Sequence, residues 1–132
     1  MKNLLKILSP FDSVPNRHFE GQLAKIFLVL TVATSLIHCW MNTIGVLMSI
    51  KMNAIHLGTL MAVTYLLYPA FSSSPRKRPS YFDWVFAALS ILTAAYMLLN
   101  YDRLLETNMT PLMLDLAVAV VVIVLLTEAS RR

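Results

Sequence analysis

Four long stretches with almost no charged residue constrain this sequence more than any other feature. No Asp, Glu, Lys or Arg occurs over 26–50, 52–75 or 84–101, and a fourth apolar stretch, 107–127, carries only Asp115. A helix needs about 17–25 mostly apolar residues to cross roughly 30 Å of hydrocarbon. The sequence therefore predicts an all-α membrane protein with four transmembrane helices, near residues 22–42, 53–71, 83–101 and 110–128.

The composition indicates the same class of protein. Hydrophobic residues make up 58% of the 132 residues, charged residues make up 14%, and the mean hydropathy is +0.66. Soluble domains are about 45–50% apolar and about a quarter charged, so an ordinary soluble domain is excluded. The alternating pattern of a membrane β-barrel is also missing from the sequence. The length predicts one four-helix transmembrane domain over residues 1–132.

Lys and Arg are unevenly distributed among the segments that flank the apolar stretches. With the N-terminus inside, Lys51 and Arg103 face outward, and the other nine of the 11 basic residues face the cytoplasm. The positive-inside rule then predicts that both termini are cytoplasmic. The densest basic segment contains Arg76, Lys77 and Arg78. We interpret it as a topology anchor, with binding of anionic lipid headgroups as the alternative, and no nucleic-acid partner is needed to explain it.

The predicted helices are flanked by residues typical of a membrane interface. Residues 1–8 combine two lysines with apolar side chains, and the apolar part is too short for a secretory signal peptide. They predict a short amphipathic helix at the inner leaflet. Trp40 and Trp84 lie near helix ends, where aromatic side chains anchor a membrane protein.

Two histidines lie within the apolar stretches, where polar side chains are costly to bury and often functional. His38 falls about one turn before the outer end of the helix near 22–42, and His56 about one turn after the outer start of the next helix. Antiparallel helices place both at a similar depth, as axial ligands of a b-type haem would require. We favour a structural role, in which each imidazole bonds a backbone carbonyl or water.

Asp115 is the charged residue that interrupts the fourth apolar stretch. Thr110 and Pro111 look like an N-cap followed by proline at the first helical position. This places Asp115 near the positive end of the helix dipole, where an ionised carboxylate is stabilised. We therefore predict a structural acid, with a proton- or cation-carrying role as the alternative.

No group of residues in the sequence forms a recognisable catalytic or metal-binding constellation. Glu128 precedes Arg131 and Arg132 by three and four residues, the spacing of a structural ion pair at a helix end. The three glycines are isolated, so a glycine-rich phosphate loop is excluded. We expect no enzyme activity, no cofactor and no metal, and a small scaffold or accessory subunit fits the residues best.

Several short segments, in order along the chain, resemble one family of membrane proteins. They read FEGQLAK at 19–25, AIHL at 54–57, LLYPA at 66–70, YFDW at 81–84, NY at 100–101, TP at 110–111, DL at 115–116 and EASRR at 128–132. In this order and spacing they resemble the small four-helix membrane subunit of TRAP (tripartite ATP-independent periplasmic) transporters, in particular the type paired with TAXI solute-binding proteins. The resemblance covers most of the chain.

The resemblance implies a secondary transporter in the bacterial inner membrane that imports small organic acids, often dicarboxylates, using an ion gradient. A periplasmic TAXI-type binding protein would deliver the substrate, and a large multi-helix membrane subunit would hold the substrate and ion sites. The small subunit would pack against the large one within the lipid bilayer. The resemblance gives Glu20, Asp83, Asp115 and Arg131 structural positions at helix ends. In many relatives the four-helix part is fused ahead of the large permease, whereas we expect a separate subunit here.

Two other classes of membrane protein remain as alternatives. A haem-bearing membrane anchor of a respiratory enzyme would use the two histidines as ligands. A small drug/proton antiporter has a similar length but needs a carboxylate deep in its first helix. The helix near 22–42 contains no carboxylate, and the nearest one, Glu20, lies before its start.

Overall fold

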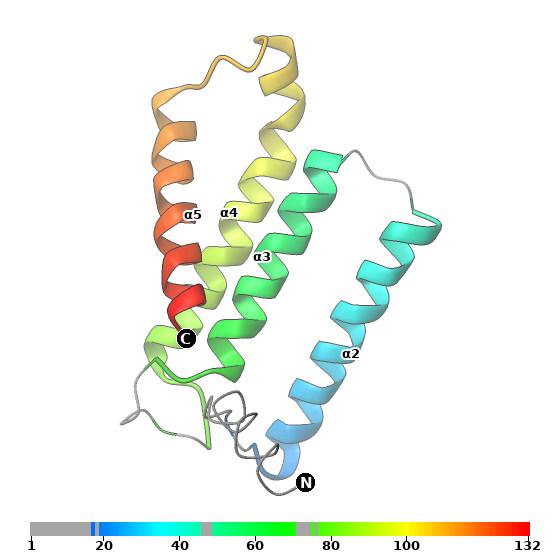
Figure 1. Ribbon diagram of the computed structural model, residues 1–132, viewed down its shortest axis with the longest axis vertical. Coiled ribbons are helices and arrows are strands. Elements are labelled where there is room, and N and C mark those ends of the chain that lie inside the picture. The colour runs from blue at the N-terminus through cyan, green and yellow to red at the C-terminus, as the bar shows by residue number, and fades with distance from the viewer. Residues whose placement is uncertain (1–16, 18, 46–48, 71–74, 76) are drawn as a thin grey trace, which may run out of the picture.

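The computed structural model describes residues 17, 19–45, 49–70, 75 and 77–132, and they form an all-helical bundle (Figure 1). The helices are α2 (Gly21–Thr43), α3 (Ser49–Leu67), α4 (Tyr81–Glu106) and α5 (Met113–Arg131). All four are long and apolar enough to cross a membrane, and no strand occurs among the described residues. The predicted four apolar helices are thus confirmed. The predicted interfacial helix over 1–8 lies outside the described residues.

The helix boundaries differ most from the prediction at the connection between α4 and α5. The prediction ended the third helix at 101, whereas α4 continues to Glu106. Asn108 and Met109 then adopt positive φ angles of 51° and 61°, which reverse the chain. The N-cap of α5 is Leu112. The prediction of Thr110 as N-cap with Pro111 at the first helical position is therefore wrong.

The most extensive packing joins α3 to α4, where small side chains let the two backbones approach. Gly58 is buried in α3, and a Cβ atom built there would lie 2.5 Å from the Cβ of Ala94 and 3.0 Å from the carbonyl oxygen of Ser90. Ser90 and Thr93 are buried on the facing side of α4. Their hydroxyls donate to the α4 carbonyls of Phe86 and Ser90, so both buried hydroxyls have partners within α4.

The core cluster of buried side chains lies toward the end of the bundle where α3 and α5 finish and α4 begins. Its members, contributed by all four helices, are Phe27, Met61, Ala62, Tyr65, Leu66, Ala87 and Leu125. We call this end of the bundle the Asp83 end, and the opposite end, where α5 begins, the Asp115 end. The last described residue, Arg132, and the first, Arg17, both lie at the Asp83 end, because both contact Asp83.

Helix α2 is the least tightly packed of the four. Within it, Phe27 and Met41 are the buried residues, and Phe27 stacks on Phe19 with ring centroids 4.1 Å apart. Most of its large apolar side chains are exposed. Such a surface suits lipid tails or another protein, because burial against a second helix gains little hydrophobic energy within a bilayer.

We predict that Gly58→Ala destabilises the bundle by loosening the contact between α3 and α4. Alanine is the better helix former by about 1 kcal/mol, but its Cβ would overlap Ala94, and overpacking costs about 1–3 kcal/mol. We expect a lower midpoint of thermal unfolding in detergent. Ala117→Val, on an exposed site of α5, is the matched control and should leave the midpoint unchanged. A Gly58→Ala protein as stable as its parent would contradict the close packing.

Candidate functional site: charge networks at the helix ends

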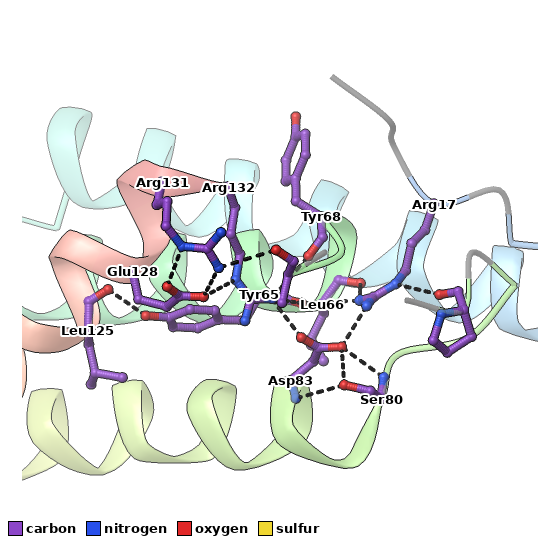
Figure 2. A network of polar contacts seen from close by, with 12 residues as sticks. Arg17, Tyr65, Leu66, Tyr68, Ser80, Asp83, Leu125, Glu128, Arg131 and Arg132 are labelled. Atoms are coloured by element: carbon purple, nitrogen blue, oxygen red, sulfur yellow. Dashed lines mark hydrogen bonds and ion pairs between the residues drawn. The ribbon is translucent and has the colours of Figure 1, made fainter. Parts of the chain in front are cut away.

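The strongest polar feature of the structure is a buried carboxylate held by two arginines (Figure 2). Asp83 Oδ2 lies 2.5 Å from Nη2 of Arg17, and Asp83 Oδ1 lies 2.6 Å from Nη1 of Arg132. All three side chains have an exposed fraction of 0%. Charges so deeply buried are tolerated only when they are paired and hydrogen-bonded. The three groups therefore depend on one another.

Asp83 also caps the start of its own helix. Ser80 is the N-cap of α4, and its backbone N–H donates to Asp83 Oδ2 over 2.8 Å while its hydroxyl donates over 2.6 Å. The backbone N–H of Asp83 donates back to the Ser80 hydroxyl, which completes a capping box. The Ser80-x-x-Asp83 capping box therefore orients the carboxylate through contacts within the start of its own helix.

The two arginines that bind Asp83 also satisfy the carbonyl oxygens at the end of α3. The last four carbonyls of a helix have no partner inside the helix, and Pro69 has no N–H to offer them. Arg17 Nη1 donates to the carbonyl of Leu66 over 2.8 Å. Arg132 Nη1 donates to the carbonyl of Tyr65 over 3.4 Å and to that of Tyr68, the residue after the helix, over 3.1 Å. Positive charge at this helix end also complements the helix dipole.

Tyr65 joins three helices beside this network. From α3, its hydroxyl donates to the carbonyl oxygen of Leu125 in α5, and its ring packs against Phe86 of α4 with centroids 5.3 Å apart. The Arg132 guanidinium carbon lies 4.7 Å from the Tyr65 ring centroid, a cation–π distance. This contact offsets the cost of Arg132 Nη2, which has no hydrogen-bond partner within the described part of the chain.

Glu128 connects the exposed surface to this buried cluster. Arg131 binds it through two nitrogens, each 2.7 Å from a carboxylate oxygen, and Arg132 Nε lies 3.2 Å away. The sequence predicted a structural ion pair of Glu128 with Arg131 and Arg132, and the structure brings all three together. It also shows that the neighbouring Arg132 is the buried member of the set.

A second network, at the Asp115 end, repeats this arrangement between α4 and α5. Asp115 Oδ1 accepts from the hydroxyl of Tyr96 and from Nη2 of Arg103, both over 2.6 Å. Its other oxygen accepts from the backbone N–H of Leu112 over 2.7 Å, at the start of α5. The side chain of Asp115 is 10% exposed. Each carboxylate oxygen thus already has a donor within the chain.

His38 and His56 lie in contact between α2 and α3, with ring centroids 4.5 Å apart and ring planes inclined at 53°. The Thr59 hydroxyl lies 3.1 Å from Nε2 of His38. An iron with two axial imidazoles would separate the ligating nitrogens by about 4 Å, with each ring centre further out. This arrangement does not fit a haem between the two rings, because they already touch and Nε2 is engaged.

The residues interpreted as membrane anchors lie on the surface. Trp40 and Trp84 are 54% and 52% exposed, near opposite ends of the bundle. Lys77 pairs with Glu20 over 3.2 Å, and Arg78 is exposed. Arg76 lies outside the described residues.

Three residues of the buried network, Arg17, Tyr65 and Ser80, were not singled out from the sequence as site residues. Arg132 was predicted only as a partner of Glu128, and only the family resemblance placed Asp83 at a helix end. The available signal was the Ser-x-x-Asp capping pattern before a long apolar run. A single sequence does not show which of the arginines that flank the helices would bind Asp83.

Comparison of the chain with protein families, curated proteins and solved structures finds no match.

We predict that Asp83→Asn strongly destabilises the protein, because it leaves buried Arg17 without a counter-charge and leaves Arg132 with Glu128 alone. Removing one partner of a buried ion pair costs about 3–5 kcal/mol. Asp102→Asn makes the same chemical change at an exposed pair with Lys51, where Asp102 is 75% exposed, and should cost less than about 1 kcal/mol. Denaturant unfolding in detergent, followed by circular dichroism, measures both. Equal effects of the two substitutions would refute this account of the network.

Proposed function

We propose that this chain is the small scaffolding membrane subunit of a TRAP-type transporter of the TAXI variety. In this proposal it has no catalytic role and binds no substrate. It packs in the inner membrane against a large multi-helix subunit that carries small organic acids, and a periplasmic binding protein docks on the complex. The family resemblance of segments along the chain, from 19–25 to 128–132, supports this assignment.

One structural observation carries the scaffolding role. The three carboxylates that are buried or partly buried in the helices, Asp83, Asp115 and Glu128, are each bound by arginine at a helix end. A carboxylate that carries protons or cations through a membrane must exchange partners with its cargo. These carboxylates instead join helices to each other, which suits a rigid support for a moving partner.

The distribution of charge supports an orientation with both chain ends in the cytoplasm. At the Asp83 end lie the basic residues Arg17, Lys25, Lys77, Arg78, Arg131 and Arg132, whereas Lys51 and Arg103 lie at the opposite end. By the positive-inside rule the Asp83 end faces the cytoplasm. The Asp115 end would then face the periplasm and the substrate-binding protein.

Co-purification from the native host tests this proposal directly. The chain is tagged at its N-terminus, extracted in mild detergent and analysed by mass spectrometry of the purified complex. We expect a large multi-helix permease in a one-to-one ratio. An untagged strain is the control for adventitious capture. Purification as a homodimer, or together with a respiratory enzyme, would overturn the proposal in favour of an antiporter or an anchor subunit.

We predict that Asp115→Asn lowers the yield of the complex or reduces transport modestly. The substitution removes the charge that binds Arg103 but leaves the amide able to accept a hydrogen bond from Tyr96. His38→Ala should behave in the same way through the contact between α2 and α3. Transport of a radiolabelled substrate, scaled to the amount of assembled complex, measures the effect. Complete loss of transport in a fully assembled complex would contradict a purely structural role.

A further inference from the structure

The pair of histidines between α2 and α3 has a feature that a merely structural role does not use. The Thr59 hydroxyl lies 2.7 Å from the carbonyl oxygen of Ile55, to which it donates, and 3.1 Å from Nε2 of His38. A hydroxyl has one proton to donate. Because Thr59 donates it to the carbonyl oxygen of Ile55, its oxygen is left to accept a hydrogen bond from His38. In this arrangement neutral His38 carries its proton on Nε2 and presents a lone pair on Nδ1.

This arrangement resembles the surroundings of a metal-binding histidine. Such a histidine donates its second ring N–H to a fixed acceptor, which sets the tautomer and the ring orientation. Thr59 supplies that acceptor for His38. His56 is exposed, and its ring has no hydrogen-bond partner in the part of the chain that the structure describes. Both rings thus have a nitrogen available as a ligand.

We propose that His38 and His56 form a two-histidine site for a divalent transition-metal ion such as Zn²⁺. Tetrahedral Zn²⁺ binds imidazole nitrogens at about 2.0–2.1 Å, which places two of them about 3.4 Å apart. Two imidazoles bound in this way have ring centroids about 5 Å apart, and the centroids here are 4.5 Å apart. The proposal therefore requires the exposed His56 side chain to change its rotamer so that both nitrogens reach one ion. No third His, Cys, Asp or Glu joins the pair among the described residues, so water completes the coordination.

The position of the pair makes the site accessible from the Asp115 end. His38 lies five residues before the end of α2 and His56 lies seven residues after the start of α3, so at 1.5 Å per residue both are within about 11 Å of a helix end. Exposed Asn42 and Asn53 lie between the histidines and that end. These polar side chains offer hydrogen-bonding groups to water along the approach.

Binding at this site would fasten α2 to the rest of the bundle. The described contacts of α2 with α3 are few, and α2 buries little of its surface. One ion shared by His38 and His56 adds a cross-link near the end of α2 opposite to Phe27. The metal therefore acts on the placement of a helix rather than on a reaction.

Zn²⁺ binding to the full chain in mild detergent, together with any co-purifying partner, tests this proposal. Equilibrium dialysis should show one Zn²⁺ per chain. Thermal unfolding should show a midpoint about 5 °C higher at a Zn²⁺ concentration ten times the dissociation constant. His38→Gln and His56→Gln should each abolish the shift. His18→Gln, at the remaining histidine of the chain, is the matched control and should keep it.

His56→Cys separates loss of a ligand from loss of the fold. A thiolate is also a zinc ligand, so this variant should bind Zn²⁺ at pH 8 where His56→Gln does not. The proposal is overturned by a wild-type chain that binds no Zn²⁺. It is equally overturned if binding survives in His38→Gln, or if His18→Gln removes it.

Discussion

The carbonyl oxygens at the end of α3 impose the constraint on which the rest of the structure depends. Where water is scarce, backbone groups without partners are expensive, and Pro69 ends the helix without supplying a donor. Arg17 and Arg132, from opposite ends of the described chain, provide these donors. Two buried guanidinium groups then need a counter-charge, which Asp83 supplies. One carboxylate thereby joins α3, α4, α5 and the segment that precedes α2.

A similar arrangement of an aspartate, a helix N-cap and an arginine occurs at each of the two ends of the bundle. Asp83 lies in the first turn of α4 and Asp115 in the first turn of α5, and each accepts a hydrogen bond from the backbone N–H of its own N-cap residue, Ser80 and Leu112 respectively. Each also accepts from an arginine elsewhere in the fold. Each of these aspartates thus caps its own helix and also binds a residue from another element. Between the two ends, contact relies on small residues that allow close packing.

The four helices could be predicted because a membrane-spanning helix must be one continuous apolar segment, and such segments are visible in the sequence. The start of α5 was misplaced, since Pro111 suits a first helical turn but here lies in the loop between the positive-φ residues Asn108 and Met109 and the N-cap Leu112. The equal depth of His38 and His56 followed from antiparallel helices, whereas their contact depends on helix rotation. Arg17 looked like a topology charge and Arg132 like a partner of Glu128, because only the tertiary fold shows that both side chains are buried against Asp83.

The placement of α2 determines which apolar surface the bundle exposes toward its neighbours in the bilayer. Its exposed apolar side chains gain little from packing on α3, because lipid offers them similar surroundings. Specific contacts near its two ends therefore determine where it lies. At the Asp83 end Phe27 stacks on Phe19, and the backbone N–H of Arg17 donates to the carbonyl of Leu67. Toward the Asp115 end His38 meets Thr59. A helix held mainly at its ends leaves its long apolar face available to a neighbour in the bilayer.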